Sequence, residues 1–335
     1  MIIKEIQMLV KAWYSCPTYG HFKGFFSCSR MMVMFMLQIW IRMLNNKIFV
    51  GCVKRLENLV CCLCVLIVLC WFLQIFCLAT FRIPSDSMYP TLQPGDNILV
   101  NKWVMGARIF DIWEAAEEKE VEIHRLPGLG KVKRNDVLVF HFPYPRSNDS
   151  LSMHLLRYYV KRCIALPGDT MGIRQGHYYI KGLDDQIGNV DAQERIARLK
   201  KDDARGIVIE TYPWDKYINW TIQDFGPLHV PAKGQTVAMD STAVKLYRNL
   251  IAWEQKKKLT SQGNDVFLGD SLIQEYCFRE NYYFMGGDNM ENSKDSRYWG
   301  LLPEPYIVGV ATRIWKSVDK YTDEVRWDRV MKRIE

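Results

Sequence analysis

Cysteine is scarce in most of this chain and is concentrated at one end. Eight of the ten cysteines precede residue 80, and only Cys163 and Cys277 follow it. Two cysteines are too few for a disulfide scaffold, and neither group has the histidine spacing of a zinc site. We therefore expect no bound metal, while a single disulfide between Cys163 and Cys277 stays open.

The chain also lacks a basic surplus where a folded domain would use one. The formal charge is +7, but residues 1–58 carry eight Lys and Arg against two Glu, which leaves only +1 for residues 59–335. A nucleic-acid-binding domain carries positive charge on its folded part. We therefore expect no nucleic-acid partner. Disorder is excluded as well, because 49% of the residues are hydrophobic.

What the sequence does contain is a membrane-length apolar run. Leu59–Ala79 has no charged residue over 21 positions, and as a helix it would measure roughly 31 Å, the thickness of a bilayer core. A buried core helix is the alternative, but Gln74 is nearly the only polar residue. Because the basic surplus precedes the run, the positive-inside rule predicts a single-pass protein with a cytoplasmic N-terminus.

A second apolar stretch, Met31–Ile41, is bracketed by Arg30 and Arg42. It falls short of the about 20 residues that a spanning helix needs. We interpret it as an interfacial helix. A second span, and a translation start assigned too early, remain alternatives.

After Arg82 the pattern indicates a mainly β fold with an antiparallel sheet. Short β-rich runs are separated by Pro, Gly, Asn and Asp. The expected strands are Asn97–Asn101, Asp136–Phe142, Tyr158–Leu166, Tyr178–Lys181, Ile207–Thr211, Tyr282–Met285 and Ile307–Trp315. Helices are expected at Asp191–Asp202 and Asp240–Glu254.

These patterns predict four parts of the chain. Residues 1–58 form a basic N-terminal segment, and residues 59–79 form a transmembrane helix. Residues 80–182 and 276–335 form the β core. Residues 183–275 form an inserted α+β domain.

Three stretches carry candidate chemistry. The first, Ile83–Pro90 with the sequence IPSDSMYP, places Ser87 within roughly 30 Å of the apolar run, since an extended chain covers about 3.3–3.6 Å per residue. Taken alone, two serines beside prolines indicate only a turn.

The second stretch is a strand pattern that ends in Pro-Gly-Asp. Alternation puts Tyr159, Lys161 and Cys163 on one face. An exposed lysine here would be an ordinary solvated charge. A desolvated one loses its proton more easily and can accept a proton from a serine hydroxyl.

The third stretch, Gly286–Arg297, is a tight Gly-Asp-Asn turn followed by Asp295 and Arg297, which can form an ion pair. A calcium loop is the alternative. Its ligand alternation is poor, and Lys294 and Arg297 intrude.

Together the three motifs resemble those of the bacterial type I signal peptidases, the leader peptidases, from the apolar run to about Trp315. The resemblance implies a Ser/Lys serine endopeptidase that needs no cofactor. Ser87 matches its nucleophile, Lys161 its general base, and Ser85 together with the Ser87 N–H its oxyanion hole. Further matches orient or support the lysine and its turn: Ser293, Asp295, Arg297, Asp288 and Asn289.

We accordingly expect an enzyme that removes signal peptides from exported preproteins at small-x-small sites such as Ala-x-Ala. It would be a monomer in the bacterial cytoplasmic membrane, with its catalytic domain on the outer side in contact with the bilayer. The substrate would add as an extended strand along residues that we expect to line its pocket: Ile83, Pro84, Tyr159 and Val160.

Asp86 is one departure, since a small or neutral residue is expected between the two serines. Alternation turns its side chain away from theirs, so we expect tolerance. Competing interpretations are a histidine base, with His154 nearest Lys161 in sequence; a self-cleaving repressor-type protein, which would lack the apolar run; and a membrane-tethered, non-catalytic β scaffold of the export machinery.

Overall fold

The computed structural model describes residues 33–38, 40, 47–110, 123–145, 150–153, 155, 157–200, 206–263 and 265–335. The chain divides into two compact units, Met1–Cys70 and Trp71–Glu335. Residues 33–38 and 40 are helical. The rest of the proposed interfacial stretch Met31–Ile41 lies outside the described residues.

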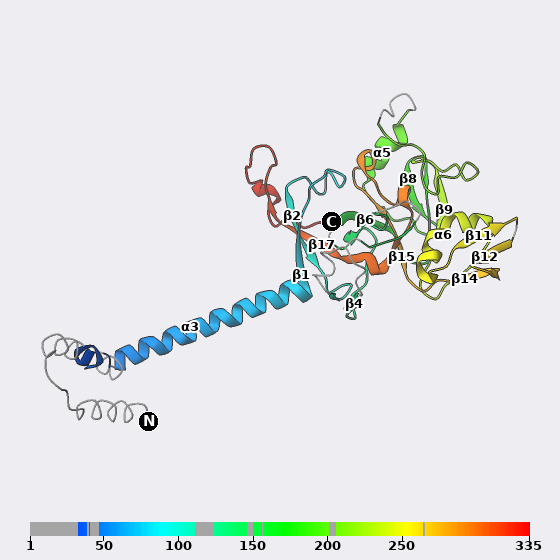
Figure 1. The fold of residues 1–335 in the computed structure, drawn as a ribbon. Coiled ribbons are helices and arrows are strands. Elements are labelled where there is room, and N and C mark those ends of the chain that lie inside the picture. The colour runs from blue at the N-terminus through cyan, green and yellow to red at the C-terminus, as the bar shows by residue number, and fades with distance from the viewer. Residues whose placement is uncertain are drawn as a thin grey trace, which may run out of the picture. The chain divides into compact units, whose positions relative to one another are not determined.

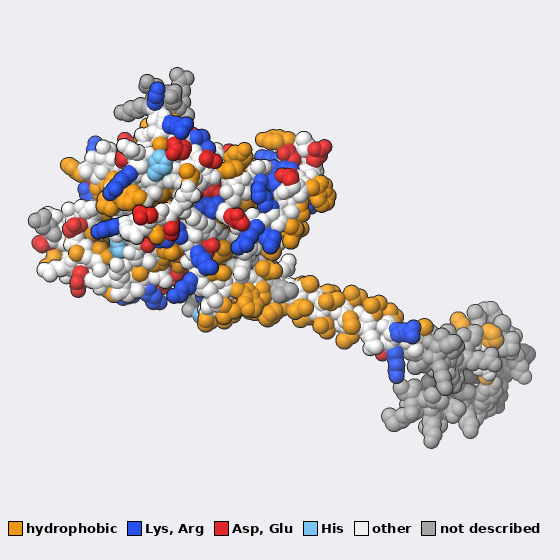
Figure 2. All heavy atoms as spheres, turned by 180° about the vertical axis from the view of Figure 1, so that it is seen from behind, with side chains coloured by type: hydrophobic (Ala, Val, Ile, Leu, Met, Phe, Trp, Pro, Cys, Tyr) orange, Lys and Arg blue, Asp and Glu red, His pale blue; other side chains and the backbone are white. Residues whose placement is uncertain are grey.

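The apolar helix α3 spans Lys47–Phe72. Within it, the 22 residues Gly51–Phe72 are long and apolar enough to cross a membrane, and their side chains are not buried inside the protein. Figure 2 shows hydrophobic side chains along this helix. A helix that is apolar all round and not covered by protein has the character of a membrane span. It is the one candidate span among the described residues.

The helix begins and ends earlier than the apolar run Leu59–Ala79. A π-helical turn, η1 (Leu73–Cys77), follows it, and the last two residues of the run enter strand β1 (Leu78–Arg82). Strand β1 pairs over its whole length with β2 (Asp96–Asn101). The apolar residues at its start therefore satisfy their backbone groups in a sheet, which hydropathy alone does not reveal.

The central element is a seven-stranded antiparallel sheet of order β1-β2-β17-β5-β6-β15-β16 (Figure 1). Its remaining strands are β5 (Val137–His141), β6 (Tyr158–Ala165), β15 (Tyr282–Gly286), β16 (Leu302–Pro303) and β17 (Ile307–Ser317). The mainly β fold is thus confirmed.

Two hydrophobic clusters pack around this sheet. The smaller one contains Ile83, Met88 and Val139, with Val160 against its edge. The larger one contains Cys163 and Ile164. Strand β6 contributes to both clusters, because Tyr159 packs against the larger one and Val160 against the smaller one, and Lys161 follows these two residues.

Three small sheets contain the strands of the predicted inserted region, residues 183–275, together with strands that lie or extend just outside it, since β7 and β8 precede residue 183 and β14 ends at Cys277. One has the order β8-β7-β9, one pairs β10 with β14, and one has the order β11-β12-β13. The strands are β7 (Thr170–Arg174), β8 (His177–Ile180), β9 (Phe225–His229), β10 (Thr236–Ala238), β11 (Leu259–Gln262), β12 (Asp265–Leu268), β13 (Ser271–Ile273) and β14 (Glu275–Cys277). A further pair joins β3 (Arg108–Ile109) to β4 (His124–Arg125).

The two predicted helices are present as α5 (Val190–Arg198) and α6 (Ser241–Gln255). Asp240 caps α6 by accepting from the Ala243 N–H at 2.6 Å. The expected strand Ile207–Thr211 is wrong, because only an isolated bridge between Glu210 and Thr221 forms there. The chain instead turns at Tyr212 and Pro213, and the Tyr212 N–H bonds to the carbonyl of Arg297.

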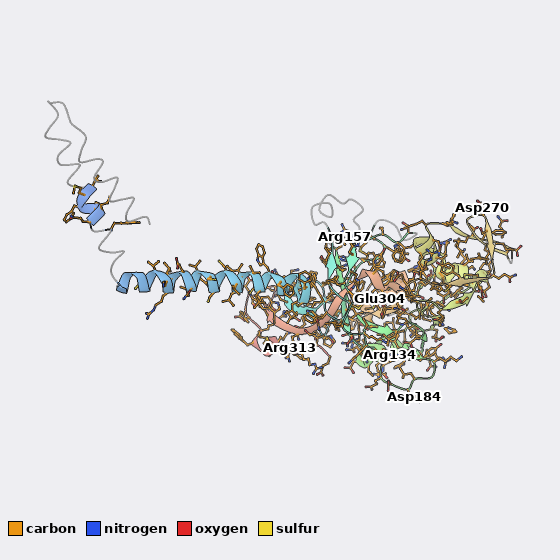
Figure 3. All side chains as sticks on the ribbon, turned by 90° about the horizontal axis from the view of Figure 1, so that it is seen from below. Arg134, Arg157, Asp184, Asp270, Glu304 and Arg313 are labelled. Atoms are coloured by element: carbon orange, nitrogen blue, oxygen red, sulfur yellow. The ribbon has the colours of Figure 1, made fainter. Side chains whose placement is uncertain are left out.

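Figure 3 shows the side chains on the ribbon, with Arg134 among those labelled. Arg134 donates to the Asp169 carboxylate at 2.7 Å, which ties the turn before β5 to the turn after β6.

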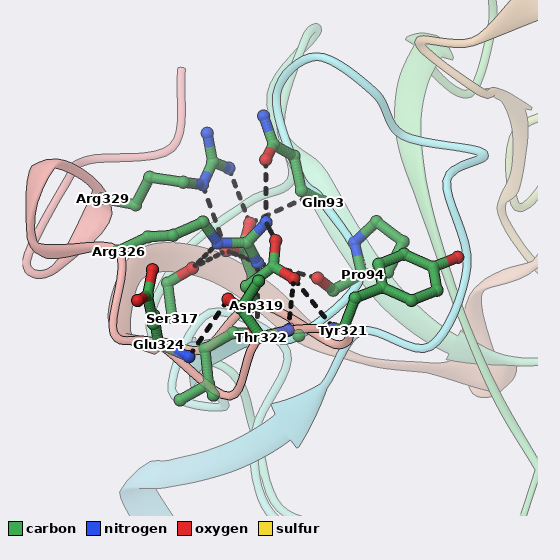
Figure 4. A network of polar contacts seen from close by, with 12 residues as sticks. Gln93, Pro94, Ser317, Asp319, Tyr321, Thr322, Glu324, Arg326 and Arg329 are labelled. Atoms are coloured by element: carbon green, nitrogen blue, oxygen red, sulfur yellow. Dashed lines mark hydrogen bonds and ion pairs between the residues drawn. The ribbon is translucent and has the colours of Figure 1, made fainter.

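Residues after β17 fold back over the sheet and form a polar network (Figure 4). Asp96 is fully buried, and Arg329 contacts both of its carboxylate oxygens at 3.1 and 2.6 Å. Arg329 also donates to the carbonyl of Thr91 at 2.9 Å. This C-terminal segment, which includes the short helix η5 (Trp327–Arg329), therefore supports the chain just after Ser87.

Candidate active site

Ser87 lies in a turn that follows strand β1. The Tyr89 N–H bonds to the carbonyl of Asp86 at 2.9 Å, and the Leu92 N–H bonds to that of Met88 at 2.8 Å. Met88 is only 2% exposed and belongs to the smaller hydrophobic cluster. The apolar residue beside the serine thus anchors the turn, while Ser87 itself stays half-buried.

Lys161 reaches this serine from strand β6. Its Nζ lies 2.5 Å from the Ser87 Oγ, although the two residues are 74 positions apart. The lysine is 3% exposed. Burial lowers the pKa of Lys161 from its usual 10.5 to about 8, although the carboxylates of Asp295 and Asp288 act in the opposite direction. A neutral amine in contact with a hydroxyl has the geometry of a general base and a nucleophile.

The segment that follows β15, residues Gly287–Arg297, lies on the other side of the site and leads into the short helix α7 (Ser296–Trp299). We call this segment the Gly287–Arg297 loop. It contains the short helix η3 (Met290–Asn292). The Asn289 N–H bonds to the carbonyl of Ser87 at 3.1 Å. Gly287 lies against the same carbonyl, since a Cβ at this position would be 2.8 Å from it and 2.0 Å from the Ser293 Oγ. Only a glycine fits between the loop and the serine.

Two arginine–carboxylate pairs hold this loop in place. Asp295 and Arg297 are fully buried and joined by two hydrogen bonds of 2.9 Å. Burial alone would raise the pKa of Asp295, but Arg297 beside it lowers that pKa overall. Asp288 pairs with Arg162 through two bonds of 2.7 Å. Because Arg162 directly follows Lys161, this second pair connects the loop to the lysine-bearing strand.

Ser293 is buried beside Gly287, but its Oγ makes no hydrogen bond to a described residue. The expected hydrogen bond to the Lys161 amine is therefore not formed in this structure, and its role stays a prediction. Ser85 is exposed. Within the described part of the chain, neither its hydroxyl nor the Ser87 N–H donates to another residue, so both donors are open to a bound substrate.

The residues expected to line the substrate pocket lie around one strand edge. Ile83 is 4% exposed within the smaller cluster, and Val160 packs against that cluster. Tyr159 stacks on Phe142 with ring centroids 4.7 Å apart. Pro84 is exposed. Strand β15 pairs with β6 from Arg162 onward, so within the described part of the chain the first half of β6 has a strand neighbour only on the β5 side.

The alternatives to a Ser/Lys site are a metal site, a histidine base and a disulfide between Cys163 and Cys277. No group of His, Cys, Asp and Glu in the described ranges has a metal-binding arrangement. The three acids of the alternative calcium loop, Asp288, Glu291 and Asp295, are each paired with an arginine. His154 lies outside the described residues. Cys163 is buried, Cys277 is exposed, and both are free thiols.

Sequence reasoning missed three residues of the site. Arg162 follows Lys161 directly and is 6% exposed, so its pairing with Asp288 is part of the site frame. The sequence predicts only a turn at Gly287, whereas the structure places it against the Ser87 carbonyl. Asn292 contacts the carboxylate of Asp86. Arginine next to the candidate base was an available signal, whereas the contact of Asn292 spans 206 positions and has no local signature.

Comparisons with known proteins agree on one family. The model of the family "Signal peptidase, peptidase S26" matches residues 56–316. The signal peptidase I of Buchnera aphidicola subsp. Schizaphis graminum is 28% identical over 268 residues, which cover 76% of this chain and 73% of that one. The signal peptidase I of Pseudomonas aeruginosa is 28% identical over 256 residues, which cover 73% and 67%.

Among solved structures, a signal peptidase I from Enterococcus faecalis matches at 23% identity with a TM-score of 0.27, covering 55% of this chain and 98% of that one. A TM-score this low adds nothing about the fold. The family model, in contrast, covers most of the sequence and includes all three motifs. This chain therefore belongs to the signal peptidase family, peptidase S26.

Proposed function

We propose that this chain removes signal peptides from exported preproteins with Ser87 as nucleophile and Lys161 as general base. The observation that carries the proposal is the 2.5 Å contact between the Lys161 Nζ and the Ser87 Oγ in a buried site. Its family relatives are named signal peptidase I. A non-catalytic scaffold would leave a desolvated lysine in contact with a serine, at a cost in stability and without use.

In this mechanism, the neutral Lys161 amine takes the Ser87 proton as the serine oxygen attacks the scissile carbonyl. The Ser87 N–H and the Ser85 hydroxyl donate to the developing oxyanion. The protonated lysine then gives its proton to the leaving amine, which breaks the peptide bond. Water hydrolyses the acyl-enzyme, with Lys161 again as base.

The substrate would bind as an extended strand along the open edge of β6. Among the described residues, Tyr158–Lys161 have no partner strand on the β15 side, so a peptide can add its backbone there. Ile83 and Val160 would line small pockets that accept residues such as alanine in Ala-x-Ala sites. Ile83, Pro84 and Tyr159 would flank the cleaved bond.

The enzyme would act as a monomer at the outer surface of the bacterial cytoplasmic membrane. α3 would span the bilayer with the N-terminus in the cytoplasm, because the basic surplus of the chain lies before the apolar helix. The cut would then be made at the membrane surface, where the signal peptide ends.

The proposal is tested with the full chain in detergent and a preprotein substrate. Wild type should release the mature protein, and both Ser87→Ala and Lys161→Ala should abolish release. The matched controls Ser271→Ala and Lys181→Ala change exposed residues of the same types and should cleave normally. Cleavage that persists in both active-site variants would overturn the residue roles, and an inactive wild type would favour the scaffold interpretation.

A further inference from the structure

Asp86, the residue between the two serines, has a hydrogen-bond partner in this structure. The Asp86 side chain is exposed, yet both of its carboxylate oxygens accept from the Asn292 Nδ2, at 3.1 and 3.2 Å. Asn292 closes the short helix η3 within the Gly287–Arg297 loop. The side chain does turn away from the serines, as alternation predicted. It turns toward a definite partner.

The backbone on either side of this contact is held by the same loop. The Asn289 Nδ2 donates to the carbonyl of Asp86 at 3.3 Å, and the Asn289 N–H donates to that of Ser87 at 3.1 Å. The carbonyl of Asp86 also accepts from the Tyr89 N–H. Two consecutive peptide groups, next to the candidate nucleophile, are thus docked on one loop.

Two arginines hold this loop in place. Arg297, buried with Asp295, also donates to the carbonyl of Met290 at 2.8 Å. From the inserted region, Arg195 of α5 approaches Glu291 at 3.4 Å. The two residues before Asn292 are therefore connected to the buried frame and to α5. The Asp86–Asn292 contact links this frame to the exposed turn that carries Ser87.

We propose that Asp86 and Asn292 form a clamp that positions Ser87 and its N–H for attack. Both are positioning residues, because neither contacts the reacting atoms, and the inference rests on the proposed function. Rotation of the peptide between Asp86 and Ser87 would move the hydroxyl away from Lys161 and turn the N–H away from the oxyanion. Misplacement of the hydroxyl and the N–H in this way lowers the rate of the chemical step strongly, while substrate binding is retained.

The test compares single and paired variants of the full chain in detergent. Asp86→Ala and Asn292→Ala should each lower kcat by about tenfold, as loss of one hydrogen bond to a charged group allows, with KM nearly unchanged. The double variant should lose no more than the worse single one, because both remove the same contact. The exchanged pair Asp86→Asn with Asn292→Asp restores an amide–carboxylate contact and should recover most of the activity. Asp270→Ala, which removes an exposed acid between β12 and β13, is the matched control.

A second measurement does not depend on activity. Hydrogen exchange of the Tyr89 and Asn289 amides should be faster by about tenfold in Asn292→Ala, unchanged in Asp270→Ala, and close to wild type in the exchanged pair. An inactive wild type would defeat the proposed function, and the exchange rates would still decide the clamp. Single variants that keep kcat within about twofold, effects that multiply in the double variant, or unchanged amide exchange would overturn the clamp.

Discussion

At the scale of single residues, the burial of Lys161 decides what this site can do. A lysine with its usual pKa would be almost fully charged at neutral pH and could not accept a proton. At 3% exposure the pKa of Lys161 falls to about 8, so a useful fraction is neutral near physiological pH. The nearby carboxylates Asp295 and Asp288 keep the pKa from falling further.

The first prediction concerns the pH dependence of cleavage. Lys161 is the active base only when it is neutral, which is the form above its pKa. We therefore expect kcat/KM for a preprotein peptide to rise with pH through a midpoint of about 8 and to level off above it. Enzyme returned to pH 8 after each exposure should recover its rate, which separates titration from unfolding. A rate that is flat from about pH 6 to about pH 9, a window that spans the pKa of Lys161, would contradict the assignment.

The same burial has a cost in stability. The pKa of Lys161 is about 8 in the folded chain and 10.5 without burial, so below pH 8 the folded state holds a charge that it disfavours. Replacing it by methionine, as Lys161→Met, should raise the free energy of unfolding at pH 6 by roughly 1–3 kcal/mol. The gain should shrink as pH rises from about 8 to 10.5, where neither state holds the proton.

Denaturant unfolding of the detergent-solubilised chain at several pH values measures this gain. Lys181→Met changes an exposed lysine and should alter stability little. Destabilisation by Lys161→Met at pH 6 would show that the contact with Ser87 outweighs the desolvation penalty.

Sequence reasoning located the residues with a local signature and missed those without one. Ser87 and Lys161 stand in specific motifs, and a strand lysine flanked on its own face by Tyr159 and Cys163 was a reasonable candidate for burial. The partner of Asp86 could not be predicted, because Asn292 reaches it across 206 positions. Nor does a motif report that the Ser293 Oγ has no hydrogen-bond partner in the described chain.

At the scale of elements, the Gly287–Arg297 loop determines how closely the site can pack. Gly287 has no side chain, and the loop backbone lies against the carbonyl of Ser87 and the side chain of Ser293. Its neighbours are fixed by the buried pair of Asp295 and Arg297. A close-packed interior of this kind yields little when an atom is added.

The third prediction is that Gly287→Ala inactivates the enzyme. The added Cβ would lie 2.0 Å from the Ser293 Oγ and 2.8 Å from the Ser87 carbonyl oxygen, so the loop and the nucleophile turn must separate. We expect a loss of kcat of about a hundredfold or more, measured with the preprotein assay. Gly51→Ala, where nothing lies within 4 Å of the new atom, is the control. Normal cleavage by Gly287→Ala would mean that the loop shifts without cost to the site.

The strands show which elements local pattern can predict. Strands β2, β5, β6, β15 and β17 were expected because they are apolar, alternating and bounded by turn residues. The short pairs of the inserted region, such as β10 with β14, are only three residues long and depend on distant partners. Ile207–Thr211 had strand composition, but its backbone bonds to Trp220 and Ile222 instead of extending a sheet. Tertiary contacts overrode propensity there.

At the scale of the whole molecule, charge and hydropathy are divided along the chain. Residues 1–58 carry a net +6 from eight basic and two acidic residues, and the apolar helix follows them. Unit Trp71–Glu335 contains the sheet and the candidate site. Composition was enough to predict one span, whereas the change from helix to strand at Leu78 depends on the pairing of β1 with β2.

The fourth prediction concerns the orientation of this chain in the membrane. If the positive-inside rule holds, the N-terminal segment faces the cytoplasm and Cys277, an exposed thiol of the β unit, faces outward. A membrane-impermeant maleimide carrying a polymer tag should therefore add one mass increment to the protein in intact spheroplasts. Cys277→Ser should remove that increment, because Cys163 is buried. Cys16 and Cys28, which precede the span in the sequence, should react only after permeabilisation. Labelling of Cys277 that also requires permeabilisation would place the candidate site in the cytoplasm, where a signal peptide emerging outside could not reach it.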